Sequence, residues 1–586
     1  MSSLERVLEV DDLHVTFPGG VRAVRGASLE VEAGEVVGLV GESGSGKSML
    51  GLAALGLLPR APAPVVSGRV DLGGLDMLSA PDSERRARRG VYIGAVFQDP
   101  MTSLNPTMRI GRQVSEAAGG APRGAVAALL ERAHIPNAAG RLQQFPHELS
   151  GGLRQRVMIA MAIARSPRLI VADEPTTALD VTVQAGVLDL LAELRRELGT
   201  AVLLVTHDLG VAAQICDRIA VAYAGRIVEA GAAWTLLREH QHPYTVGLMA
   251  SRPRLDRVRG ERLASLPGRP PDPRDLPDGC AFAPRCPVSD ALCAEAPAPQ
   301  TRHGERIECH RPGALAAWPA AEATAPLDPG ASLEDGPALV ARELVVDYRV
   351  RGRKLSRERV TLRALDHVSI EVPAGGALAI VGESGSGKTT LLRTVIGLVE
   401  PTSGSVQLTG ERPQLVFQDA GASLTPWLSI GAHLRERLAV AGVPRGERAA
   451  RVEEAIEAVG LGIETLGALP KQLSGGQRQR AAIARAIVVP PRLLACDEPV
   501  SALDVSLAAQ VLNLLAELRH RLGIALLFVT HDLAVARAIA DEIVVMRNGQ
   551  IVERGHAEDV LGAPQHEYTQ ELLAAVPGLP VLEGVA

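Results

Sequence analysis

Short runs of apolar residues, many of them β-branched, recur along the chain and end at polar or glycine-rich segments. Three such runs, at residues 36–40 (VVGLV), 169–172 (LIVA) and 202–205 (VLLV), are typical of buried parallel strands. The run at 50–58 (LGLAALGLL) predicts a helix directly after a glycine-rich segment. Because a polar motif follows each strand, these motifs are expected at the carboxyl edge of an open α/β sheet, where such sheets bind ligands.

The chain contains an internal duplication. Residues 38–48 (GLVGESGSGKS) return almost unchanged at 379–389 (AIVGESGSGKT). Four further blocks repeat in the same order: VFQD at 96–99 and 416–419, LSGG at 149–152 and 473–476, DEP at 173–175 and 497–499, and VTHD at 205–208 and 529–532. Five paired blocks in one order indicate two copies of one unit. The stretch before VFQD is shorter in the second half, so we expect a reduced accessory sheet there.

The expected domains follow from this duplication and from composition. The segment 313–337 is rich in alanine and proline and lacks amphipathic periodicity, so we interpret it as a linker. We expect a first unit over residues 1–275, a cysteine-rich extension over 276–312 and a second unit over 338–586. At 586 residues the chain exceeds what one hydrophobic core usually organises, in agreement with at least two domains.

Charge and hydropathy narrow the functional classes. The chain carries 61 Lys and Arg against 67 Asp and Glu, so it lacks the basic footprint of nucleic-acid binders, and no nucleic-acid partner is expected. No stretch approaches the roughly 20 apolar residues of a membrane-spanning helix, and the first residues do not resemble a signal peptide. We therefore expect a cytoplasmic protein that would need separate membrane subunits for any transport role.

The glycine-rich segments match the pattern G-x-x-x-x-G-K-[ST] between a strand and a helix, which predicts a phosphate-binding loop. Backbone N–H groups would wrap the phosphates, the following helix offers its positive end, and Lys47 or Lys388 would neutralise the β- and γ-phosphates. Ser48 and Thr389 are expected to ligate Mg²⁺. The other loop residues expected to contact the phosphates are Gly41, Ser43, Gly44 and Gly46 in the first half and Gly382, Ser384, Gly385 and Gly387 in the second.

Two adjacent acidic residues follow a buried strand in each half, a placement that suits nucleotide hydrolysis. In the first half Asp173 is predicted to hold the hydrated Mg²⁺ and Glu174 to orient the attacking water. Asp497 and Glu498 are their counterparts. Each site is also expected to contain a glutamine that bridges metal and water and a histidine that reaches the γ-phosphate: Gln98 and His207 in the first half, Gln418 and His531 in the second.

The LSGG block opens a helix in each half. A serine, two glycines and a helix N-terminus form an anion-binding end. A second phosphate site in each unit, besides the phosphate loop, suggests that the two units pair head to tail. The residues expected to form this second site are Ser150 and Gly152 in the first half and Ser474 and Gly476 in the second.

Together the phosphate loop, VFQD, LSGG, DEP, [TS]ALD and THD blocks resemble the ATP-binding-cassette (ABC) ATPases, twice over nearly the whole chain. The resemblance implies an α/β fold of two P-loop NTPase cassettes in tandem, each with a RecA-like core, a helical subdomain and an antiparallel accessory sheet. In that family two cassettes sandwich two ATP molecules, so the phosphate loop of each half would face the LSGG of the other. Asp180 and Asp504 would connect the sites across the interface.

Two aromatic residues are candidates for stacking on adenine. Phe17 and Tyr348 each lie upstream of a phosphate loop in a chain with only 2% aromatic residues. The alternative is that each is a core aromatic at the end of a strand.

Narrower clues point to one branch of the family. The sequence FQDPMTSLNP at 97–106, Leu153 after LSGG, HPYT at 242–245 and the cysteine cluster resemble the ATPases of oligopeptide, dipeptide and nickel permeases. This resemblance implies the motor of a peptide importer, peripheral on the cytoplasmic face of the membrane. Its partners would be two membrane permease subunits and an extracytoplasmic solute-binding protein. Ala420 and Thr425 depart from the usual proline and asparagine in the segment that would face the membrane subunit.

Four of the six cysteines lie close together in sequence: Cys280, Cys286, Cys293 and Cys309. Structural zinc usually uses tighter C-x-x-C pairs, although His303 and His310 lie nearby, and four thiolates also fit an iron–sulfur cluster. Unliganded thiols are the third possibility. The CAFAPRC segment with the later CH resembles the C-terminal extension of peptide-permease ATPases, which in some members holds a 4Fe-4S cluster. This resemblance adds a 4Fe-4S cluster to ATP and Mg²⁺ as an expected cofactor.

A soluble tandem-cassette factor acting on ribosomes or nucleic acid is the alternative function. Ribosome-recycling cassettes carry their iron–sulfur cysteines before the first cassette, whereas these cysteines follow it. Translation-factor cassettes tend to place a long charged helical linker between the units, and this linker is rich in alanine and proline. The resemblance therefore favours the importer.

Overall fold

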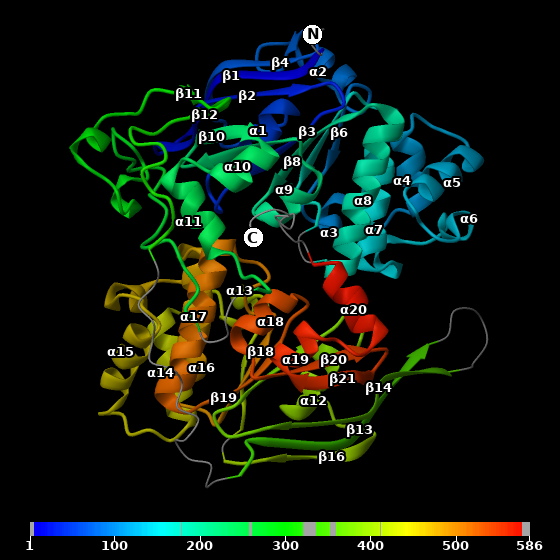
Figure 1. The fold of residues 1–586 in the computed structure, drawn as a ribbon. Helices are drawn as coiled ribbons and strands as arrows, with labels where there is room; N and C mark the ends of the chain where they lie inside the picture. Colours follow the sequence, from blue (N-terminus) through cyan, green and yellow to red (C-terminus); the bar gives the residue numbers. More distant parts are fainter. Residues whose placement is uncertain are drawn as a thin grey trace.

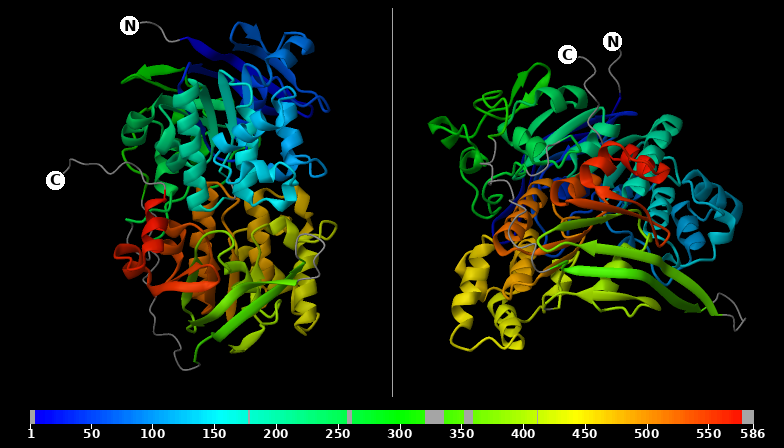
Figure 2. Two further views of the ribbon diagram at one scale, coloured as in Figure 1. Left: turned by 90° about the vertical axis from the view of Figure 1, so that its right-hand side faces the viewer. Right: turned by 60° about the horizontal axis from the view of Figure 1, so that its bottom comes forward.

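The protein folds into two α/β halves that pack one on the other (Figure 1). The computed structural model describes residues 5–176, 179–256, 261–319, 336–351, 359–410 and 412–576. In Figure 1 the first half, blue to green, forms the upper part of the molecule, and the second half, yellow to red, forms the lower part. The two further views in Figure 2 show the same stacking of the halves.

The core sheet of the first half has eight strands, of which the central ones are parallel. Across the sheet the strands are β6 (Ile93–Val96), β7 (Leu169–Asp173), β8 (Ala201–Thr206), β3 (Val36–Val40), β9 (Arg218–Tyr223), β10 (Arg226–Ala232), β12 (Glu305–Ile307) and β11 (Gln300–Arg302). Strands β3 and β8 are buried at every position, as expected for a parallel sheet covered on both faces. The three strands predicted from apolar runs are thereby confirmed.

The helices of the first half fall into two groups. A helical subdomain, at the right in Figure 1, contains α3 (Pro100–Ser103), α4 (Ile110–Ala117), α5 (Arg123–Arg132), α6 (Ala138–Arg141) and α7 (Gly151–Ala162). The other helices follow strands of the core sheet: α1 (Lys47–Ala54), α8 (Val181–Leu198), α9 (Leu209–Ile215), α10 (Ala233–Glu239) and α11 (Pro243–Ser251). Helix α1 ends earlier than the predicted 50–58 because Gly56, just past it, adopts a φ of +61°, a conformation that terminates helices.

An antiparallel accessory sheet covers the core of the first half. Its strands are β2 (Val21–Glu32), β1 (Arg6–Phe17), β4 (Val65–Leu72) and β5 (Leu75–Asp76), and α2 (Asp82–Arg88) follows them. One apolar cluster contains Val10 of the accessory sheet, Leu39 of the core sheet and Leu50 of α1. The start of α1 is therefore held between the two sheets.

The second half repeats this plan with fewer strands. Its core strands are β17 (Gln414–Val416), β18 (Leu493–Asp497), β19 (Ala525–Val529), β15 (Ala377–Val381), β20 (Glu542–Arg547) and β21 (Gln550–His556). Its accessory strands are β14 (Arg359–Val372), β13 (Leu339–Arg351) and β16 (Ser403–Leu408). Within the described residues this accessory sheet has three strands against four in the first half, which confirms the expected reduction.

The helices of the second half follow the order of the first. They are α12 (Lys388–Val395), α13 (Ala420–Ser423), α14 (Ile430–Val440), α15 (Arg448–Ala458), α16 (Gly475–Ile487), α17 (Val505–Leu522), α18 (Leu533–Ile539), α19 (Ala557–Gly562) and α20 (Glu567–Ala574). The tandem α/β architecture predicted from the repeated motifs is confirmed.

The cysteine-rich extension is joined to the core sheet of the first half. Its strands β11 and β12 continue that sheet, because β12 pairs with β10. It also contains the short 3₁₀ helices η2 (Ala283–Arg285) and η3 (Ala291–Ala294). Phe282 packs its ring 5.3 Å from that of Tyr223 and 5.4 Å from that of Tyr244. Of the predicted linker, residues 320–335 lie outside the described part of the chain, and the predicted domain boundaries stay predictions.

A short stretch after α11 crosses to the second half. The Leu263 N–H donates to Asn513 Oδ1 at 2.9 Å, and Asn513 Nδ2 donates back to the Leu263 carbonyl at 2.8 Å. Gln510 of the same helix, α17, donates to the Leu266 carbonyl at 2.8 Å. The Leu263 side chain is 4% exposed and belongs to the apolar core of the second half. The first half therefore supplies a core residue to the second.

Two buried carboxyl groups lie where the extension meets the core sheet, and they predict a pH-dependent stability. Glu229 of β10 and Glu305 of β12 are 0% and 2% exposed. Burial, with the charges of Glu229 and Glu239, raises the pKa of Glu305 from 4.5 to about 7. The folded chain therefore binds a proton that the unfolded chain releases above pH 4.5. This contribution to stability declines as pH rises from 4.5 to 7, and ionisation of Glu305 opposes folding above that range.

Replacing Glu305 with glutamine removes this titration. The Glu305→Gln variant is expected to melt several degrees above the wild-type chain at pH 8, and by a smaller margin at pH 5. Thermal unfolding at both pH values measures this difference. Glu116→Gln, at an exposed residue paired with Arg112, is the matched control and should shift neither melting temperature. A difference between Glu305→Gln and wild type that is the same at both pH values would contradict the prediction.

Candidate functional site

Each phosphate loop connects a core strand to a helix, β3 to α1 in the first half and β15 to α12 in the second. Gly41, Gly44 and Gly46 have φ of +157°, +81° and +97°, values that favour glycine. A Cβ atom on Gly41 would lie 2.1 Å from the Ala222 carbonyl oxygen, and one on Gly46 would lie 2.5 Å from that of Ala23. A Cβ on Gly44 would meet nothing within 4 Å, so the middle of the loop faces open space. The second loop repeats these angles at Gly382, Gly385 and Gly387, with φ of +147°, +84° and +106°.

The two loop lysines fold back into their own loops. Lys47 is 6% exposed, and its Nζ donates to the carbonyl oxygens of Gly41 at 2.7 Å and Glu42 at 2.9 Å. Lys388 repeats this arrangement with two carbonyl groups of its own loop, at 2.7 and 2.8 Å. Burial lowers the pKa of both lysines, and acidic side chains nearby oppose that shift. Each ammonium group is therefore next to the position that a phosphate in the loop would occupy.

The residues predicted to hold Mg²⁺ lie together in both halves. Ser48 Oγ donates to Asp173 Oδ1 at 3.3 Å, and Thr389 Oγ1 donates to Asp497 Oδ1 at 3.4 Å. Burial raises the pKa of both aspartates. A divalent cation would stabilise their charged form, and hydroxyl and carboxylate oxygens are ligands that Mg²⁺ prefers. The donor set therefore fits a magnesium ion, and the assignment of individual ligands stays a prediction.

A glutamate, a glutamine and a histidine meet in each half. Glu174 accepts a hydrogen bond from Gln98 Nε2 at 2.7 Å, and its other carboxylate oxygen lies 3.3 Å from His207 Nδ1. In the second half the Glu498 carboxylate lies 3.4 Å from Gln418 Nε2 and 3.1 Å from His531 Nδ1. The structure thus brings together the residues predicted to orient water and to sense the γ-phosphate.

The backbone and the charges of this group suit a catalytic role. Glu174 and Glu498 both have a φ of +46°, a left-handed conformation that costs a residue with a side chain about 1 kcal/mol and that clusters at functional sites. Burial would lower the pKa of His207 and His531, but the neighbouring glutamates outweigh it and raise the pKa of both. Burial would also raise the pKa of Glu498, but its hydrogen bond with His531 produces a net lowering. Glu498 is therefore held as a carboxylate, the form that accepts a proton.

Two aspartates join each phosphate loop to the opposite half. Asp504 caps the N-terminus of α17, and its Oδ2 accepts a hydrogen bond from the Ser43 N–H of the first loop at 3.2 Å. Asp180 caps α8, and its Oδ2 accepts a hydrogen bond from the Ser384 N–H of the second loop at 3.3 Å. These reciprocal contacts show that the halves pack head to tail.

The LSGG residues predicted to bind phosphate lie at the starts of α7 and α16: Ser150, Gly152, Ser474 and Gly476. Both serines are exposed N-caps. Ser474 and Gln477 exchange hydrogen bonds at 3.3 and 3.0 Å, whereas Leu153 takes the place of Gln477 in the first half, so α7 has only the serine side of this cap. The contact of these serines with nucleotide on the opposite loop stays a prediction.

The sequence analysis missed two tyrosines that bind the phosphate loops. The Glu42 N–H donates to Tyr244 Oη at 2.8 Å, and the Glu383 N–H donates to Tyr568 Oη at 3.0 Å. Tyr244 lies in the HPYT block, which the sequence offered only as a family marker, and Tyr568 lies in a similar block, HEYT at 566–569. Their recurrence after each cassette was the signal for a shared role.

The aromatic residues proposed to stack on adenine differ in exposure. Phe17 ends β1, is half-buried and packs against the core of the accessory sheet. Tyr348 of β13 is 39% exposed. Adenine stacking stays a prediction for both residues, and the alternative of a core aromatic fits the packing of Phe17.

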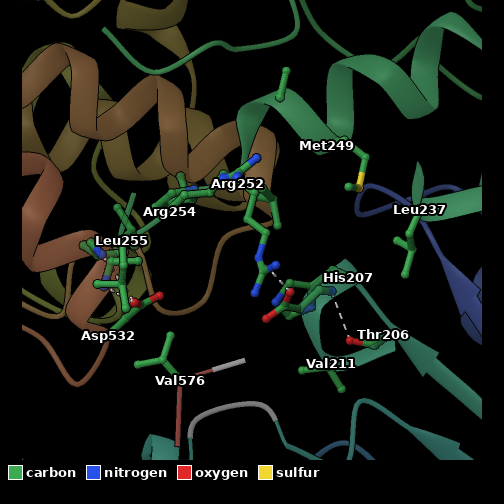
Figure 3. A pocket seen from close by; sticks show the side chains of 18 of the residues that line it. Thr206, His207, Val211, Leu237, Met249, Arg252, Arg254, Leu255, Asp532 and Val576 are labelled. Atoms are coloured by element: carbon green, nitrogen blue, oxygen red, sulfur yellow. Dashed lines mark hydrogen bonds and ion pairs between the residues drawn. The ribbon is translucent and has the colours of Figure 1, made fainter. Parts of the chain in front are cut away.

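A cavity of about 1350 Å³ lies between the halves (Figure 3). Its lining includes His207 and Asp208 from the first half and His531 and Asp532 from the second. In Figure 3 the Arg252 side chain extends toward His207, and its Nε lies 3.7 Å from Asp208 Oδ1. The cavity therefore adjoins the histidines of both sites.

The four clustered cysteines line one small cavity beside the aromatic group of the extension. Burial raises the pKa of Cys280, Cys286 and Cys309, that of Cys309 to about 11. Among the residues that the structure describes, no group of three or more His, Cys, Asp or Glu side chains is placed to hold a metal ion. The geometry therefore does not support the expected iron–sulfur cluster.

Family comparisons match both halves of the chain. The ABC transporter family matches residues 24–177 and 365–501. The family described as the oligopeptide/dipeptide transporter, C-terminal region, matches residues 228–293 and 552–583. The second match includes the tyrosine blocks and the first three cysteines of the cluster.

Individual relatives match along nearly the whole chain. The chain is 45% identical over 603 residues to the oligopeptide transport ATP-binding protein OppD of Mycobacterium tuberculosis, covering 97% of this chain and 98% of OppD. It is 39% identical over 604 residues to the glutathione import ATP-binding protein GsiA of Pectobacterium atrosepticum, covering 98% of this chain and 90% of GsiA. Among solved structures, cbiO1 from Clostridium perfringens, part of the ABC transporter complex cbiONQ, matches with a TM-score of 0.35 and 26% identity, covering 39% of this chain and 92% of cbiO1.

Proposed function

This chain belongs to the ABC transporter family, as an ATP-binding subunit of the oligopeptide importer class, and on that basis we propose that it powers peptide import from two composite ATP sites. The observation that carries the proposal is the pair of reciprocal contacts, Ser43 with Asp504 and Ser384 with Asp180. Each phosphate loop is thereby next to the opposite half. ATP bound between the halves would draw them together, and hydrolysis would release them.

The proposed hydrolysis uses the same residue types in both halves. Lys47 would neutralise the β- and γ-phosphates, and Ser48 with Asp173 would hold a Mg²⁺ ion, whose charge would offset that of the phosphate oxygens. Glu174 orients the attacking water and accepts its proton. His207 holds the Glu174 carboxylate from one side, as its 3.3 Å contact indicates. Ser474 of the other half would complete this first site, and Ser150 would complete the second.

Exposed apolar side chains support docking on membrane subunits. Phe97 and Met101 are 37% and 53% exposed, and Phe417 and Trp427 in the second half are 40% and 77% exposed. These residues lie in the same short segment as the glutamine that contacts Glu174 or Glu498. One segment in each half would therefore connect the docking surface to the residues of hydrolysis. Ala420, in contrast, is 6% exposed and lies on the inner side of that segment.

The proposed partners are two membrane permease subunits and an extracytoplasmic solute-binding protein. Within the described chain, no helix combines the length and apolar character needed to cross a bilayer. We place the chain peripherally at the cytoplasmic face of the membrane. The names of OppD and GsiA refer to oligopeptides and to glutathione, itself a tripeptide, so short peptides are the proposed cargo.

Reconstitution tests this function. Proteoliposomes that contain the chain, two candidate permease subunits and a solute-binding protein should take up labelled short peptides only when Mg·ATP is supplied on the side of the chain. Unlabelled glutathione as a competitor distinguishes tripeptide specificity from broader peptide transport. A chain that sediments with ribosomes and not with membranes would contradict the proposal and favour the soluble factor.

The 4Fe-4S cluster stays a prediction from the sequence. Its support in the structure is that all four cysteines line one cavity, and the placement of the thiols described above argues against it. Protein purified anaerobically is expected to be brown, with iron and sulfide at about four atoms each per chain. Colourless protein that contains only zinc, or no metal, would contradict this prediction. Replacing Cys286 with serine should remove the colour.

A further inference from the structure

Arg285 of the cysteine-rich extension is buried against the first phosphate loop. It is 6% exposed and ends η2, between the first two cysteines of the extension. Its Nη1 and Nη2 donate to the two carboxylate oxygens of Glu42 at 2.7 and 3.0 Å, and Glu42 is 2% exposed. Arg285 also donates to the Pro267 carbonyl at 2.8 Å and to Tyr223 Oη at 3.2 Å. Removing either partner of such a buried bidentate ion pair leaves the other partner as an unpaired buried charge.

The backbone around Glu42 connects this ion pair to the chemistry of the loop. The Glu42 carbonyl oxygen accepts a hydrogen bond from Lys47 Nζ at 2.9 Å. The next residue, Ser43, donates its N–H to Asp504 of the opposite half at 3.2 Å. A displacement of Glu42 would therefore move both the loop lysine and the contact between the halves.

The second phosphate loop has the same glutamate with a different partner. Glu383 accepts a hydrogen bond from Thr182 Oγ1 of the first half at 2.6 Å. The tyrosine contact is common to both loops, but the side-chain partner of the loop glutamate differs between them. Glu42 is thus held by Arg285 of its own half, with Ser506 of the opposite half also acting on its carboxylate, whereas Glu383 is held by Thr182 from across the interface.

We propose that Arg285 is a positioning residue for the first ATP site. By holding Glu42 it sets Lys47 and Ser43 for the nucleotide, so that the extension acts on ATP affinity at the first phosphate loop and not at the second. The two sites are then unequal, although their motifs are nearly identical. This inference rests on the proposed function as an ATPase.

The test measures ATP affinity at one loop at a time in the full chain. In a Lys388→Ala background only the first loop keeps its lysine, and in a Lys47→Ala background only the second does. Arg285→Gln should weaken binding of Mg·ATP about tenfold in the first background and leave it unchanged in the second. Arg285→Lys should recover part of the lost affinity, because lysine restores the positive charge but not the bidentate geometry of the guanidinium group.

Glu42→Gln removes the other partner of the ion pair. Glu42→Gln should weaken Mg·ATP binding at the first loop about as much as Arg285→Gln does. The double variant should lose no more affinity than either single variant. The matched control is Arg311→Gln, which breaks the ion pair of Arg311 with Asp290, two residues that both belong to the extension. This control should lower the melting temperature and leave ATP affinity unchanged.

Two results would overturn the inference. The first is an unchanged affinity at the first loop in both Arg285→Gln and Glu42→Gln. The second is an equal loss of affinity in Arg311→Gln, which would show that Arg285 only keeps the extension folded. A wild-type chain that binds no Mg·ATP at either loop would instead contradict the proposed function, and the inference with it.

Discussion

Replacing Glu174 and Glu498 together with glutamine is expected to lower ATP turnover by the full chain about 100-fold or more. Glutamine keeps the size of the side chain but cannot accept the proton of the attacking water, and a positioned general base contributes roughly 10²–10⁴ in rate. The contacts of Glu174 with Gln98 and His207 show a carboxylate fixed by its neighbours on both sides. Release of phosphate from saturating Mg·ATP measures the effect.

The single variants test whether both sites work. Glu174→Gln and Glu498→Gln should each reduce turnover, because each half contains the full group of residues predicted to be catalytic. Glu197→Gln, at an exposed residue paired with Arg132, is the control and should turn over at the wild-type rate. An undiminished rate in either catalytic variant would show that the corresponding site is idle.

Replacing one loop lysine with alanine is expected to remove one of two bound nucleotides. Lys47 and Lys388 are both buried in their loops and are predicted to supply the positive charge nearest the phosphates. Loss of such a charge-assisted contact should weaken binding at the altered loop by about 100-fold. Equilibrium dialysis with labelled ATP at micromolar concentration should give two nucleotides per wild-type chain and one per variant.

The chain offers a matched control for this experiment. Lys471 is an exposed lysine close to the LSGG block and outside either loop, and Lys471→Ala should bind two nucleotides. Wild-type stoichiometry in Lys47→Ala or Lys388→Ala would contradict the assignment of that loop as an ATP site.

Local patterns were enough to predict much of the fold and of the sites. The strand before each phosphate loop, the glycines of the loop and the acidic pair after the next strand are each encoded within a few consecutive residues. Strand β3 and the three glycines from Gly41 to Gly46 are where the sequence placed them, because burial on both faces and positive φ leave few alternatives.

Contacts between distant segments could not be predicted in the same way. Arg285 and Glu42 are separated by 243 positions, and nothing beside either residue in sequence indicates a partner. Tyr244 was visible as part of a repeated block, but its hydrogen bond to the loop depends on how α11 packs on the core sheet. The extension likewise joins the core sheet of the first half through β12, and this pairing with β10 is a contact between segments far apart in sequence. The four cysteines close together in sequence do line one cavity, but within the described residues they are not placed to hold a metal ion, so nearness in sequence alone did not predict their geometry.

The central claim is that one chain forms two ATP sites, each completed by the opposite half. The most direct test is a structure of the Glu174→Gln, Glu498→Gln double variant with Mg·ATP, in which nucleotide is trapped by slow hydrolysis. The account predicts two ATP molecules, one with its γ-phosphate between Lys47 and Ser474 and one between Lys388 and Ser150. Nucleotides bound within single halves, with Ser150 and Ser474 turned away from the phosphates in the closed state, would contradict it.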